Sequence, residues 1–536
     1  MKALKHLVAI TLALVLLVSC KEKVKTDNDH MQQQVAVESH SEETLYRPNY
    51  HFTPKKNWMN DPNGMFYYNG YYHLYFQYHP DSNVWGPMHW GHAVSTDMIT
   101  WRELPIAIYP DELGTIFSGS AVVDIGNTSG FGKVENSAPI VAMYTSSKQL
   151  EGKDNWKQTQ SIAFSNDEGK TFTKYENNPV IDNNELKDFR DPKVSWDEER
   201  SRWMMVLAAG DRIMFYESKD LKAWNYLSDF GRGIGGHGGV WECPDFFKLP
   251  VNGSDETKWV LFVSINPGGP NGGSATQYFI GDFDGTQFTM DDEFSKALNE
   301  EHTYWIDFGK DNYAGVSWSN ARTKDGSKLM IGWMSNWQYA QAVPTETWRS
   351  AMTVARKVQL QKNERGFRLI SNPVREIENY RGKKVKKENV LIANETKIID
   401  SETIDLSSVE IAFNISNLNQ EGGCTFKLSN KAGDELLFGY NNAKKLFFID
   451  RSKSGKVNFS KDFANKISLA PRTSANQNLS GRILLDKTSI ELFFDNGESV
   501  MTEIFFPNTP FNQLSIKPTN QEFNLDYIEV NQLNFN

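Results

Sequence analysis

The stretch Ser95-Thr96-Asp97-Met98-Ile99-Thr100-Trp101 returns in looser form further along the chain. The copies are Ser165-Asn166-Asp167 before Phe172, Ser218-Lys219-Asp220 before Trp224, and Gly281-Asp282 before Phe288. Each copy follows an apolar run and has the composition of a hairpin turn with an aromatic residue just after it. The acidic residues are 70, 53 and 62 positions apart. Units of that size hold about four strands each, as the blades of a β-propeller do.

Residues 46–358 have room for about five such units, so the repeat predicts a five-bladed β-propeller. The alternative is chance, because Ser-x-Asp turns are common in β proteins. The rest of this region agrees with an all-β fold. It has no long helical period, and short apolar or alternating runs occupy residues 71–78, 140–144, 203–208 and 260–265.

The pattern changes after Arg356. Residues 359–385 are expected to form a connector, with a short helical piece from Asn372 to Arg381. Alternating runs then return at residues 409–415, 435–440, 446–450 and 483–494, followed by the hairpin signal Asp495-Asn496-Gly497. Residues 386–536 are therefore predicted to be a β-sandwich. This part lacks an obvious cluster of acids and aromatics, which favours a structural companion over a binding module.

The first residues have the pattern of a targeting segment. Lys2 and Lys5 precede an apolar run at residues 7–18, which is short for a membrane span and typical of a signal peptide. The ending Leu17-Val18-Ser19-Cys20 resembles a bacterial lipobox. We therefore expect a signal peptide at residues 1–19, a lipid anchor on Cys20 in the cell envelope, and a flexible tether at residues 20–45. An ordinary signal cleaved elsewhere is the alternative.

Composition narrows the class of protein. The 536 residues exceed what one core usually supports, so two folded domains are expected. A net charge of −10 argues against nucleic acid as a partner, because phosphate binding needs clustered Lys and Arg. Aromatics make up 13% of the chain, which suits sugar binding and β-structure equally. Besides Cys20 only Cys243 and Cys424 remain, which form neither a disulfide framework nor a metal-ligand pattern.

Three short acidic segments stand out in the first region. They are Trp58-Met59-Asn60-Asp61-Pro62-Asn63-Gly64, Phe189-Arg190-Asp191-Pro192 and Trp241-Glu242-Cys243-Pro244. Taken singly, the first is a good turn, the second an ion-pairing turn, and the third a buried acid. Together they fit glycoside hydrolysis, which needs one ionised carboxylate and one acid kept protonated. We expect apolar surroundings to raise the pKa of Glu242, and polar or charged neighbours to keep Asp61 and Asp191 ionised.

These three segments, in this order, resemble glycoside hydrolase family 32, which contains invertases, levanases and inulinases. The resemblance covers about residues 46–536. Further matches lie at residues 76–78, 85–92, 117–120, 307–311, 332–337 and 344–349. The family implies a five-bladed propeller followed by a β-sandwich, with the acids at the mouth of the central funnel.

The resemblance also implies roles for single residues. Asp61 would be the nucleophile, Glu242 the acid and base, and Asp191 the group that binds hydroxyls and stabilises the transition state. Retention of configuration through a covalent fructosyl-enzyme predicts carboxyl groups about 5–5.5 Å apart. The terminal-fructose pocket would comprise Asn60, Gln77, Trp85, Phe117, Ser118, Arg190 and Trp333. Asp307 and Lys310 are expected to reach the neighbouring sugar.

The predicted function is therefore an exo-acting hydrolase that releases fructose from levan, inulin or sucrose. An endo-acting fructan hydrolase and a fructosyltransferase are alternatives within the family. A non-catalytic sugar-binding protein is a further alternative, although it would be expected to lack one of the acids. We expect no cofactor and no metal, because His89, His92 and His237 lack a ligand spacing. The expected partners are the sugar substrate and a membrane, held through Cys20, and the chain is expected to be a monomer.

Overall fold

The computed structural model describes residues 41–133, 137–152, 155–183, 185–400 and 404–535. The predicted signal peptide, Cys20 and most of the predicted tether lie outside these residues. The end of that tether is helical: α1 (Glu42–Tyr46) begins after Ser41, whose side chain accepts a hydrogen bond from the Thr44 N–H, and Leu45 is buried. The other helices are α2 (Asp292–Glu300), η1 (Ala340–Ala342), η2 (Arg375–Tyr380) and η3 (Asp495–Gly497). Among the described residues, none of the helices has the length and apolarity to span a membrane.

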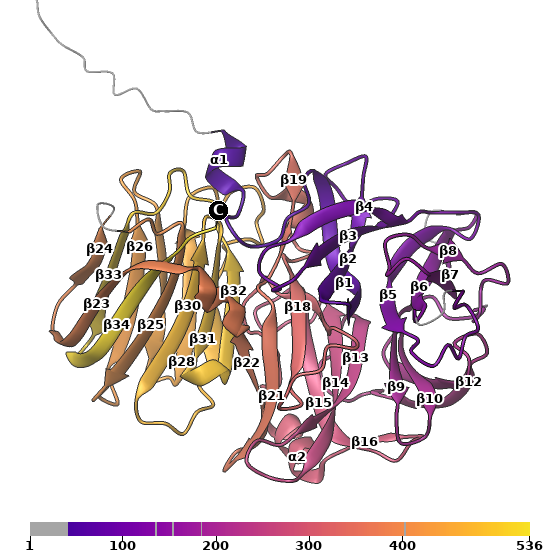
Figure 1. The fold of residues 1–536 in the computed structure, drawn as a ribbon. Coiled ribbons are helices and arrows are strands. Elements are labelled where there is room, and N and C mark those ends of the chain that lie inside the picture. Colours follow the sequence, from indigo (N-terminus) through magenta and orange to yellow (C-terminus); the bar gives the residue numbers. More distant parts are fainter. Residues whose placement is uncertain (1–40, 134–136, 153–154, 184, 401–403, 536) are drawn as a thin grey trace, which may run out of the picture. The chain divides into compact units, whose positions relative to one another are not determined.

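The described chain is otherwise β-structure, as predicted, and its first part forms separate sheets whose strands are mainly antiparallel (Figure 1). The first sheet contains β1 (Asn57–Tyr68), β2 (Tyr71–His79), β3 (His89–Ser95), β4 (Arg102–Ile108) and the late strand β19 (Trp348–Arg349). The second contains β5 (Thr115–Val123), β6 (Ile140–Gln149), β7 (Trp156–Ser165) and β8 (Thr173–Lys174). The third contains β9 (Phe189–Asp197), β10 (Arg202–Ala209), β11 (Ile213–Ser218) and β12 (Asn225–Phe230).

Two more sheets follow in the same manner. The fourth contains β13 (Val240–Pro250), β14 (Thr257–Asn266), β15 (Ala275–Phe283) and β16 (Phe288–Met290). The fifth contains β17 (Tyr313–Ser317), β18 (Lys328–Met334), β20 (Ala351–Met352), β21 (Arg356–Asn363) and β22 (Gly366–Pro373). We had predicted that residues 359–385 form a connector. The structure instead places the end of β21 and all of β22 within that range, and both strands belong to this sheet. The helical piece of that range is η2, which leads directly into the next strand.

The sequence repeat marks one structural position, the turn between the third and fourth strand of a sheet. At the end of β3 the Asp97 carboxylate accepts hydrogen bonds from the N–H groups of Ile99 and Thr100, and Asp167 and Asp220 do the same after β7 and β11. In the fourth copy the sequence repeat assigned the turn to Asp282, and this assignment was wrong. Asp282 still pairs with Thr289 across the strands, and Asp284 accepts the turn hydrogen bonds instead.

The first strands of these sheets lie against one another in a closed order. β1 contacts β5, β5 contacts β9, β9 contacts β13, β13 contacts β17, and β17 contacts β1. The circle is also joined at its edge, because β19 pairs in parallel with β1 through Asn57–Trp348 and Trp58–Arg349. The residues that β1, β5, β9, β13 and β17 carry are thereby brought to a common centre.

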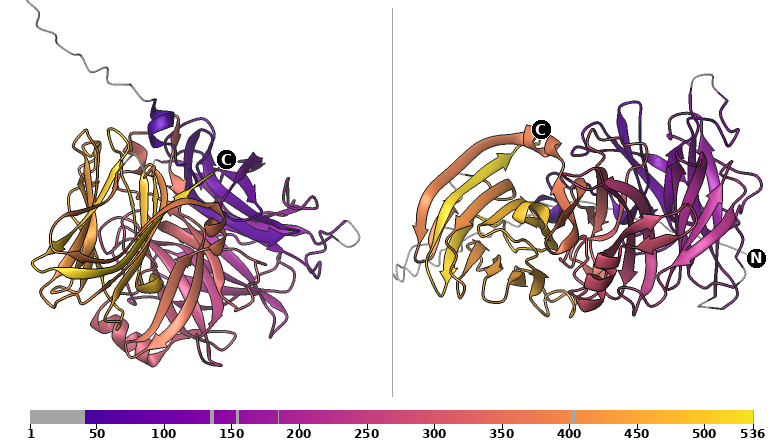
Figure 2. Two further views of the ribbon diagram at one scale, coloured as in Figure 1. Left: turned by 60° about the vertical axis from the view of Figure 1, so that its left-hand side comes forward. Right: turned by 90° about the horizontal axis from the view of Figure 1, so that it is seen from below.

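The second part of the chain consists of two six-stranded sheets that face each other (Figure 2). One contains β23 (Arg381–Ile392), β34 (Phe523–Leu533), β25 (Ser408–Ser416), β30 (Leu479–Asp486), β31 (Ser489–Phe494) and β32 (Ser499–Ile504). The other contains β24 (Thr396–Asp400), β33 (Gln513–Thr519), β26 (Gly423–Ser429), β27 (Glu435–Asn441), β28 (Leu446–Lys453) and β29 (Ser468–Pro471). The rings of Phe413 and Phe426 meet between them at 4.8 Å. The run 483–494 is two strands rather than one, and η3 is the predicted hairpin turn.

A buried ionic network joins the fifth sheet to the second part of the chain. The Arg356 guanidinium donates through Nη1 to Asp307 Oδ2 at 2.8 Å and through Nε to Glu491 Oε2 at 3.1 Å. His51 lies between Glu491 and Asp486, at 2.8 Å from an oxygen of each. Burial opposes protonation of His51, but the hydrogen bonds to the two carboxylates outweigh it and raise its pKa to about 9. All five side chains are buried and mutually satisfied.

Replacing Arg356 with alanine is expected to reduce the free energy of unfolding by about 3–5 kcal/mol, because two buried carboxylates lose their cation. Thermal and urea unfolding of the purified variant measure this. Arg322→Ala is the control, since Arg322 pairs with Glu198 at 2.8 Å on the surface and such pairs contribute about 0–1 kcal/mol. Equal losses in the two variants would contradict a stabilising role for the buried network.

Candidate active site

The three predicted acids converge on one cavity of about 300 Å³. Asp61 comes from β1, Asp191 from β9 and Glu242 from β13, strands that lie next to one another at the centre of the sheets. The other lining residues are mostly polar or aromatic: Asn60, Gln77, Trp85, Phe117, Ser118, Ser147, Trp156, Gln158, Lys187, Asp188, Arg190, Asn266 and Trp337. A cavity of this size with few apolar walls and several carboxyl groups suits a polyhydroxylated ligand.

Asp61 lies on a strand rather than in the turn that its sequence suggested. Register shifts on both sides of Pro62 and Asn63 bend β1, so the Asp-Pro-Asn-Gly segment re-aims side chains without ending the strand. Asp61 Oδ2 accepts a hydrogen bond from Ser118 Oγ at 2.9 Å, and Cys243 Sγ lies 3.5 Å away. Oδ1 is buried without a hydrogen-bond partner among the described residues. The protein thus fixes this carboxyl group through Oδ2, at a hydrogen bond that is only partly buried.

The expectation that Asp61 sits in a polar setting that favours its charge was wrong. Burial, followed by the nearby charge of Glu242, raises the pKa of Asp61, while the hydrogen bond from Ser118 offsets part of this. The pKa of Asp61 is raised because β1 lies at the centre of the sheets, where burial disfavours the charged form of the Asp61 carboxyl group.

Asp191 has an unusual backbone that its position requires. Its φ of 65° is in the left-handed region, which only a few per cent of residues other than Gly adopt, Asp among the more frequent of them. Its N–H donates to Thr145 Oγ1 at 3.0 Å, and its Oδ2 accepts from the Cys243 N–H at 2.9 Å. Cys243 has a φ of 44° and lies where the register shifts between β13 and β14. The two irregular residues hold each other, and with them the carboxyl group of Asp191.

The prediction that Arg190 keeps Asp191 ionised was also wrong. Burial raises the pKa of Asp191 to about 7, the charge of Arg190 lowers it only in part, and Glu242 and Asp61 raise it further. The guanidinium of Arg190 is turned toward other carboxylates: it donates to Glu242 Oε1 at 3.0 Å and to Asp188 Oδ1 at 2.7 Å. The cluster of acids therefore retains a proton near neutral pH.

Asp191→Asn is expected to raise the free energy of unfolding relative to the wild type, by an amount that grows as the pH rises. The folded chain keeps a proton on Asp191 up to about pH 7, whereas the unfolded chain releases it near the ordinary pKa of 3.8. Asp191 therefore contributes fully to the free energy of unfolding of the wild type below its unfolded pKa of 3.8, and this contribution is lost as the pH rises through 7. The asparagine variant does not titrate, so relative to wild type it should gain roughly 2–4 kcal/mol between pH 4 and pH 7.5.

Chemical denaturation at a series of pH values between 4 and 7.5 tests this expectation. Asp220→Asn is the control, because turn hydrogen bonds lower the pKa of Asp220 even though partial burial raises it. The effect of that substitution on stability should be nearly constant over the same range. A gain for Asp191→Asn that does not change with pH would show that the carboxyl group is ionised throughout.

Glu242 lies in polar surroundings, not in the apolar ones that Trp241 suggested. Consecutive side chains of a strand point to opposite faces, so Trp241 packs into the core against His237 and Phe279 while Glu242 faces the cavity. Its Oε1 accepts from Arg190, and its Oε2 accepts a short hydrogen bond from the Tyr313 hydroxyl. Two donors therefore hold this carboxyl group, one at each oxygen.

Most of the predicted pocket residues line the cavity, and three do not. Asn60, Gln77, Trp85, Phe117, Ser118 and Arg190 are part of its wall. Trp333 is fully buried, and its ring packs against Trp58 and Trp337, so Trp337 rather than Trp333 reaches the cavity. Asp307 belongs to the network of Arg356. Lys310 donates to the backbone carbonyl of Asp462 in the second part of the chain.

Several residues at the site escaped the sequence interpretation. Tyr313 and Cys243 contact the acids directly, and Gln158 and Asp188 both bond to Arg190. Asp188 stands directly before the second acidic segment and Cys243 lies within the third, which was a usable signal. Tyr313 and Gln158 gave none, because only the fold brings β17 and β7 to the cavity. Within the described ranges, His, Cys, Asp and Glu side chains form no group of three or more that could hold a metal ion.

Comparisons with known proteins agree along most of the described chain. The model for "Glycosyl hydrolases family 32 N-terminal domain" matches residues 51–373, and the model for "Glycosyl hydrolases family 32 C terminal" matches residues 376–532. Levanase of Bacillus subtilis is 47% identical over 477 residues, which cover 89% of this chain and 68% of the levanase. An extracellular exo-inulinase of Aspergillus niger is 40% identical over 491 residues, which cover 86% of this chain and 90% of that protein. The crystal structure of exo-inulinase from Aspergillus awamori matches with a TM-score of 0.84 at 34% identity, over 92% of this chain and 99% of that one.

Proposed function

Because the chain belongs to glycosyl hydrolase family 32, we propose that it hydrolyses the β-fructofuranosidic bonds of levan, inulin and sucrose. The observation that carries this proposal is the convergence of Asp61, Asp191 and Glu242 on one cavity. A glycosidase needs two carboxyl groups in different states at the bond that it cuts. The cavity supplies three carboxyl groups, and burial together with neighbouring charges raises the pKa of two of them, Asp61 and Asp191.

The roles of the acids follow from their contacts. The carboxylate of Asp61, which Ser118 holds through Oδ2, attacks the anomeric carbon of the fructosyl unit and forms a covalent bond as the glycosidic bond breaks. Glu242 gives a proton to the departing oxygen, then takes one from the water that hydrolyses the fructosyl-enzyme. Fructose leaves with retained configuration, and Asp61 and Glu242 return to their first states. Asp191 holds hydroxyl groups of the ring. This mechanism predicts carboxyl groups of Asp61 and Glu242 about 5–5.5 Å apart.

Exo-action is the mode that the cavity supports best. The site is a cavity of about 300 Å³ with Trp85 and Phe117 meeting edge to face at 6.2 Å on one wall. Such a wall suits the end of a chain better than a continuous polymer. Exo-inulinases are among the similar proteins, which supports the same mode. Endo-action, with release of oligosaccharides, is the second candidate.

Chromatography of the early products separates these modes. Incubation with levan, inulin and sucrose should release fructose alone from the first time point. A ladder of fructo-oligosaccharides would replace exo-action with endo-action, and transfer products longer than the substrate would indicate a fructosyltransferase. Binding of fructan without any release of sugar would contradict hydrolysis altogether.

The architecture and location are part of the proposal. The closed order β1-β5-β9-β13-β17-β1 supports a five-bladed propeller from residue 46 to Pro373, followed by the sandwich. The lipobox-like ending at Cys20 supports a lipid anchor in the cell envelope of a secreted enzyme. We propose that this enzyme acts as a monomer. Cys20→Ser should release the protein from the membrane fraction, and loss of metabolically incorporated palmitate in that variant would identify the lipid.

A further inference from the structure

A second cavity, larger than the catalytic one, lies at the other ends of the same central strands. Its volume is about 620 Å³, against about 300 Å³ for the cavity of the acids. On β9 the catalytic cavity takes Arg190 and Asp191, whereas the second takes residues 193–196. On β13, Glu242 lines the catalytic cavity and Asp245 lines the second cavity. The second cavity therefore opens at the opposite end of the ring of sheets and shares no lining residue with the first.

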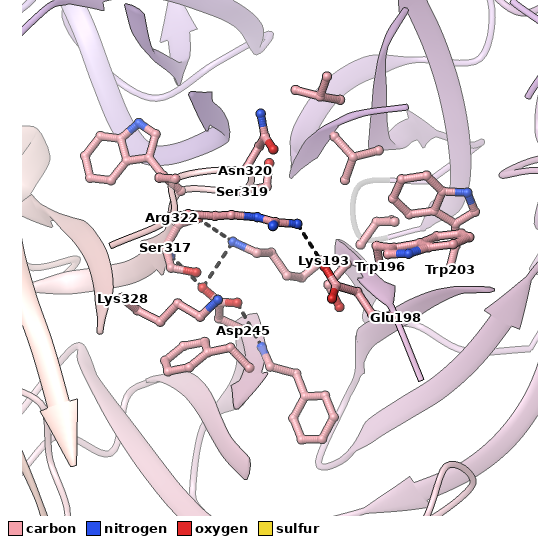
Figure 3. A pocket seen from close by; sticks show the side chains of 18 of the residues that line it. Lys193, Trp196, Glu198, Trp203, Asp245, Ser317, Ser319, Asn320, Arg322 and Lys328 are labelled. Atoms are coloured by element: carbon pink, nitrogen blue, oxygen red, sulfur yellow. Dashed lines mark hydrogen bonds and ion pairs between the residues drawn. The ribbon is translucent and has the colours of Figure 1, made fainter. Parts of the chain in front are cut away.

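One wall of the second cavity is an exposed indole. Trp196 is 40% exposed, and its ring meets that of Trp203 edge to face at 4.9 Å and 67° (Figure 3). Trp203 is itself fixed, because its Nε1 donates to Thr128 Oγ1 at 2.8 Å. The catalytic cavity has the same arrangement, with Trp85, 37% exposed, braced by Phe117. A rigid, partly exposed aromatic face is the surface on which sugar rings pack.

The lining of the second cavity also carries charges that balance. Figure 3 shows Lys193 and Lys328 reaching toward Asp245, to which Lys193 Nζ is bonded at 3.1 Å. Arg322 pairs with Glu198 at 2.8 Å. Both carboxylate oxygens of the sixth charged lining residue, Asp124, are taken up by hydrogen bonds from Thr128 and Ser129. With three cations and three anions, the lining favours a neutral, polyhydroxylated ligand over an ion.

The ammonium of Lys328 is available to donate hydrogen bonds to a ligand in the second cavity. It has no carboxylate within ion-pair distance among the described residues, and it lies 5.9 Å from the centre of the Phe247 ring. Burial lowers its pKa, Lys193 and Arg322 add to this, and Asp245 opposes it. An ammonium in this position has three N–H groups to offer to sugar hydroxyls.

We propose that this cavity is a non-catalytic binding site for a neutral oligosaccharide, with Trp196 as the stacking platform and Lys328 as a hydrogen-bond donor. The identity of the sugar as fructan rests on the proposed function. Such a site holds a polymer chain on the enzyme while another chain end enters the catalytic cavity. The two sites act as linked modules, so the gain is in affinity for polymer and not in the rate on sucrose.

The experiment counts binding sites in the full chain carrying Glu242→Gln, which keeps the ligand intact. Calorimetry with the tetrasaccharide nystose should give two sites per chain. Adding Trp196→Ala or Lys328→Met should leave one site, or weaken the second at least about tenfold, equivalent to about 1.4 kcal/mol. Tyr226→Ala is the matched control, since Tyr226 is an exposed aromatic of the same sheet that also meets a second ring, Tyr216, edge to face. It should keep both sites.

Kinetics in the otherwise wild-type enzyme gives the second measurement. Trp196→Ala should leave kcat and KM on sucrose within twofold, which also shows that the variant folds, and should raise KM on levan several-fold at unchanged kcat. A single nystose site before mutation, two sites after Trp196→Ala, or tighter Trp196-dependent binding of polygalacturonate than of levan would each overturn the proposal. If the enzyme releases no fructose from any substrate, the proposed function fails, while the count of nystose sites still decides this inference.

Discussion

Asp61→Asn abolishes turnover of sucrose and levan, with kcat expected to fall at least about 10⁴-fold, because the amide oxygen cannot form the covalent fructosyl-enzyme. The amide can still accept the hydrogen bond from Ser118, so the fold and the cavity should survive. Removal of this charge also removes one of the influences that raise the pKa of Asp191. The pKa of Asp191, measured by NMR titration, should therefore fall in the variant.

Asp188→Asn is the control for Asp61. Asp188 also lines the cavity and accepts from Arg190 at 2.7 Å, yet it is given no part in the chemistry. Its replacement should reduce kcat by less than about tenfold, since only the position of Arg190 is affected. If Asp61→Asn retains activity comparable to that of Asp188→Asn, Asp61 is not the nucleophile.

Glu242→Ala should reduce kcat on sucrose by about 10²–10⁴-fold, the usual contribution of a general acid and base. The loss should depend on the leaving group. Fluoride leaves β-fructosyl fluoride without needing a proton, so the fructosyl-enzyme still forms quickly. Its hydrolysis, which lacks the general base, becomes slow. The adduct then accumulates, and mass spectrometry should find one fructosyl unit on the peptide that contains Asp61.

Added azide distinguishes the role of Glu242 from a purely structural one. Azide needs no general base, so it should restore turnover of the fluoride and yield a fructosyl azide of retained configuration. The basic limb of the pH–rate profile should also flatten, because that limb reports the group that donates the proton. Absence of rescue, in a variant that unfolds at the wild-type temperature, would assign the acid and base role elsewhere.

The sequence was informative about the class of fold and about the three acids, because both depend on local patterns. The Ser-x-Asp turns are local hydrogen-bond systems, so Asp97, Asp167 and Asp220 could be recognised before their strands were known. The environments of the three acids could not be predicted from the sequence. The neighbour of Glu242 in sequence is Trp241, but its neighbours in space are Arg190 and Tyr313, which are 52 and 71 positions away.

The residues that were misplaced have the same explanation. Asp307 was expected at the substrate, but its partners Arg356 and Thr502 are 49 and 195 positions distant and belong to two different sheets. Trp333 and Trp337 stand four positions apart in one motif, and only the path of the chain after β18 decides which ring is buried. A motif indicates that a residue matters, whereas the contacts that the fold provides decide whether it serves binding or stability.

The parallel pairing of β19 with β1 has a consequence for the order of events during biogenesis. Trp348 lies nearly three hundred positions after its partner Asn57, so this contact forms only when almost all of the catalytic region is present. Closing so long a loop has a large entropic cost and makes a topology slow to fold. Asp61 is four positions beyond Asn57, on the strand that waits for this closure. A chain still emerging from the ribosome would therefore have no assembled site around Asp61, and activity would begin only after residues up to Arg349 have joined the fold.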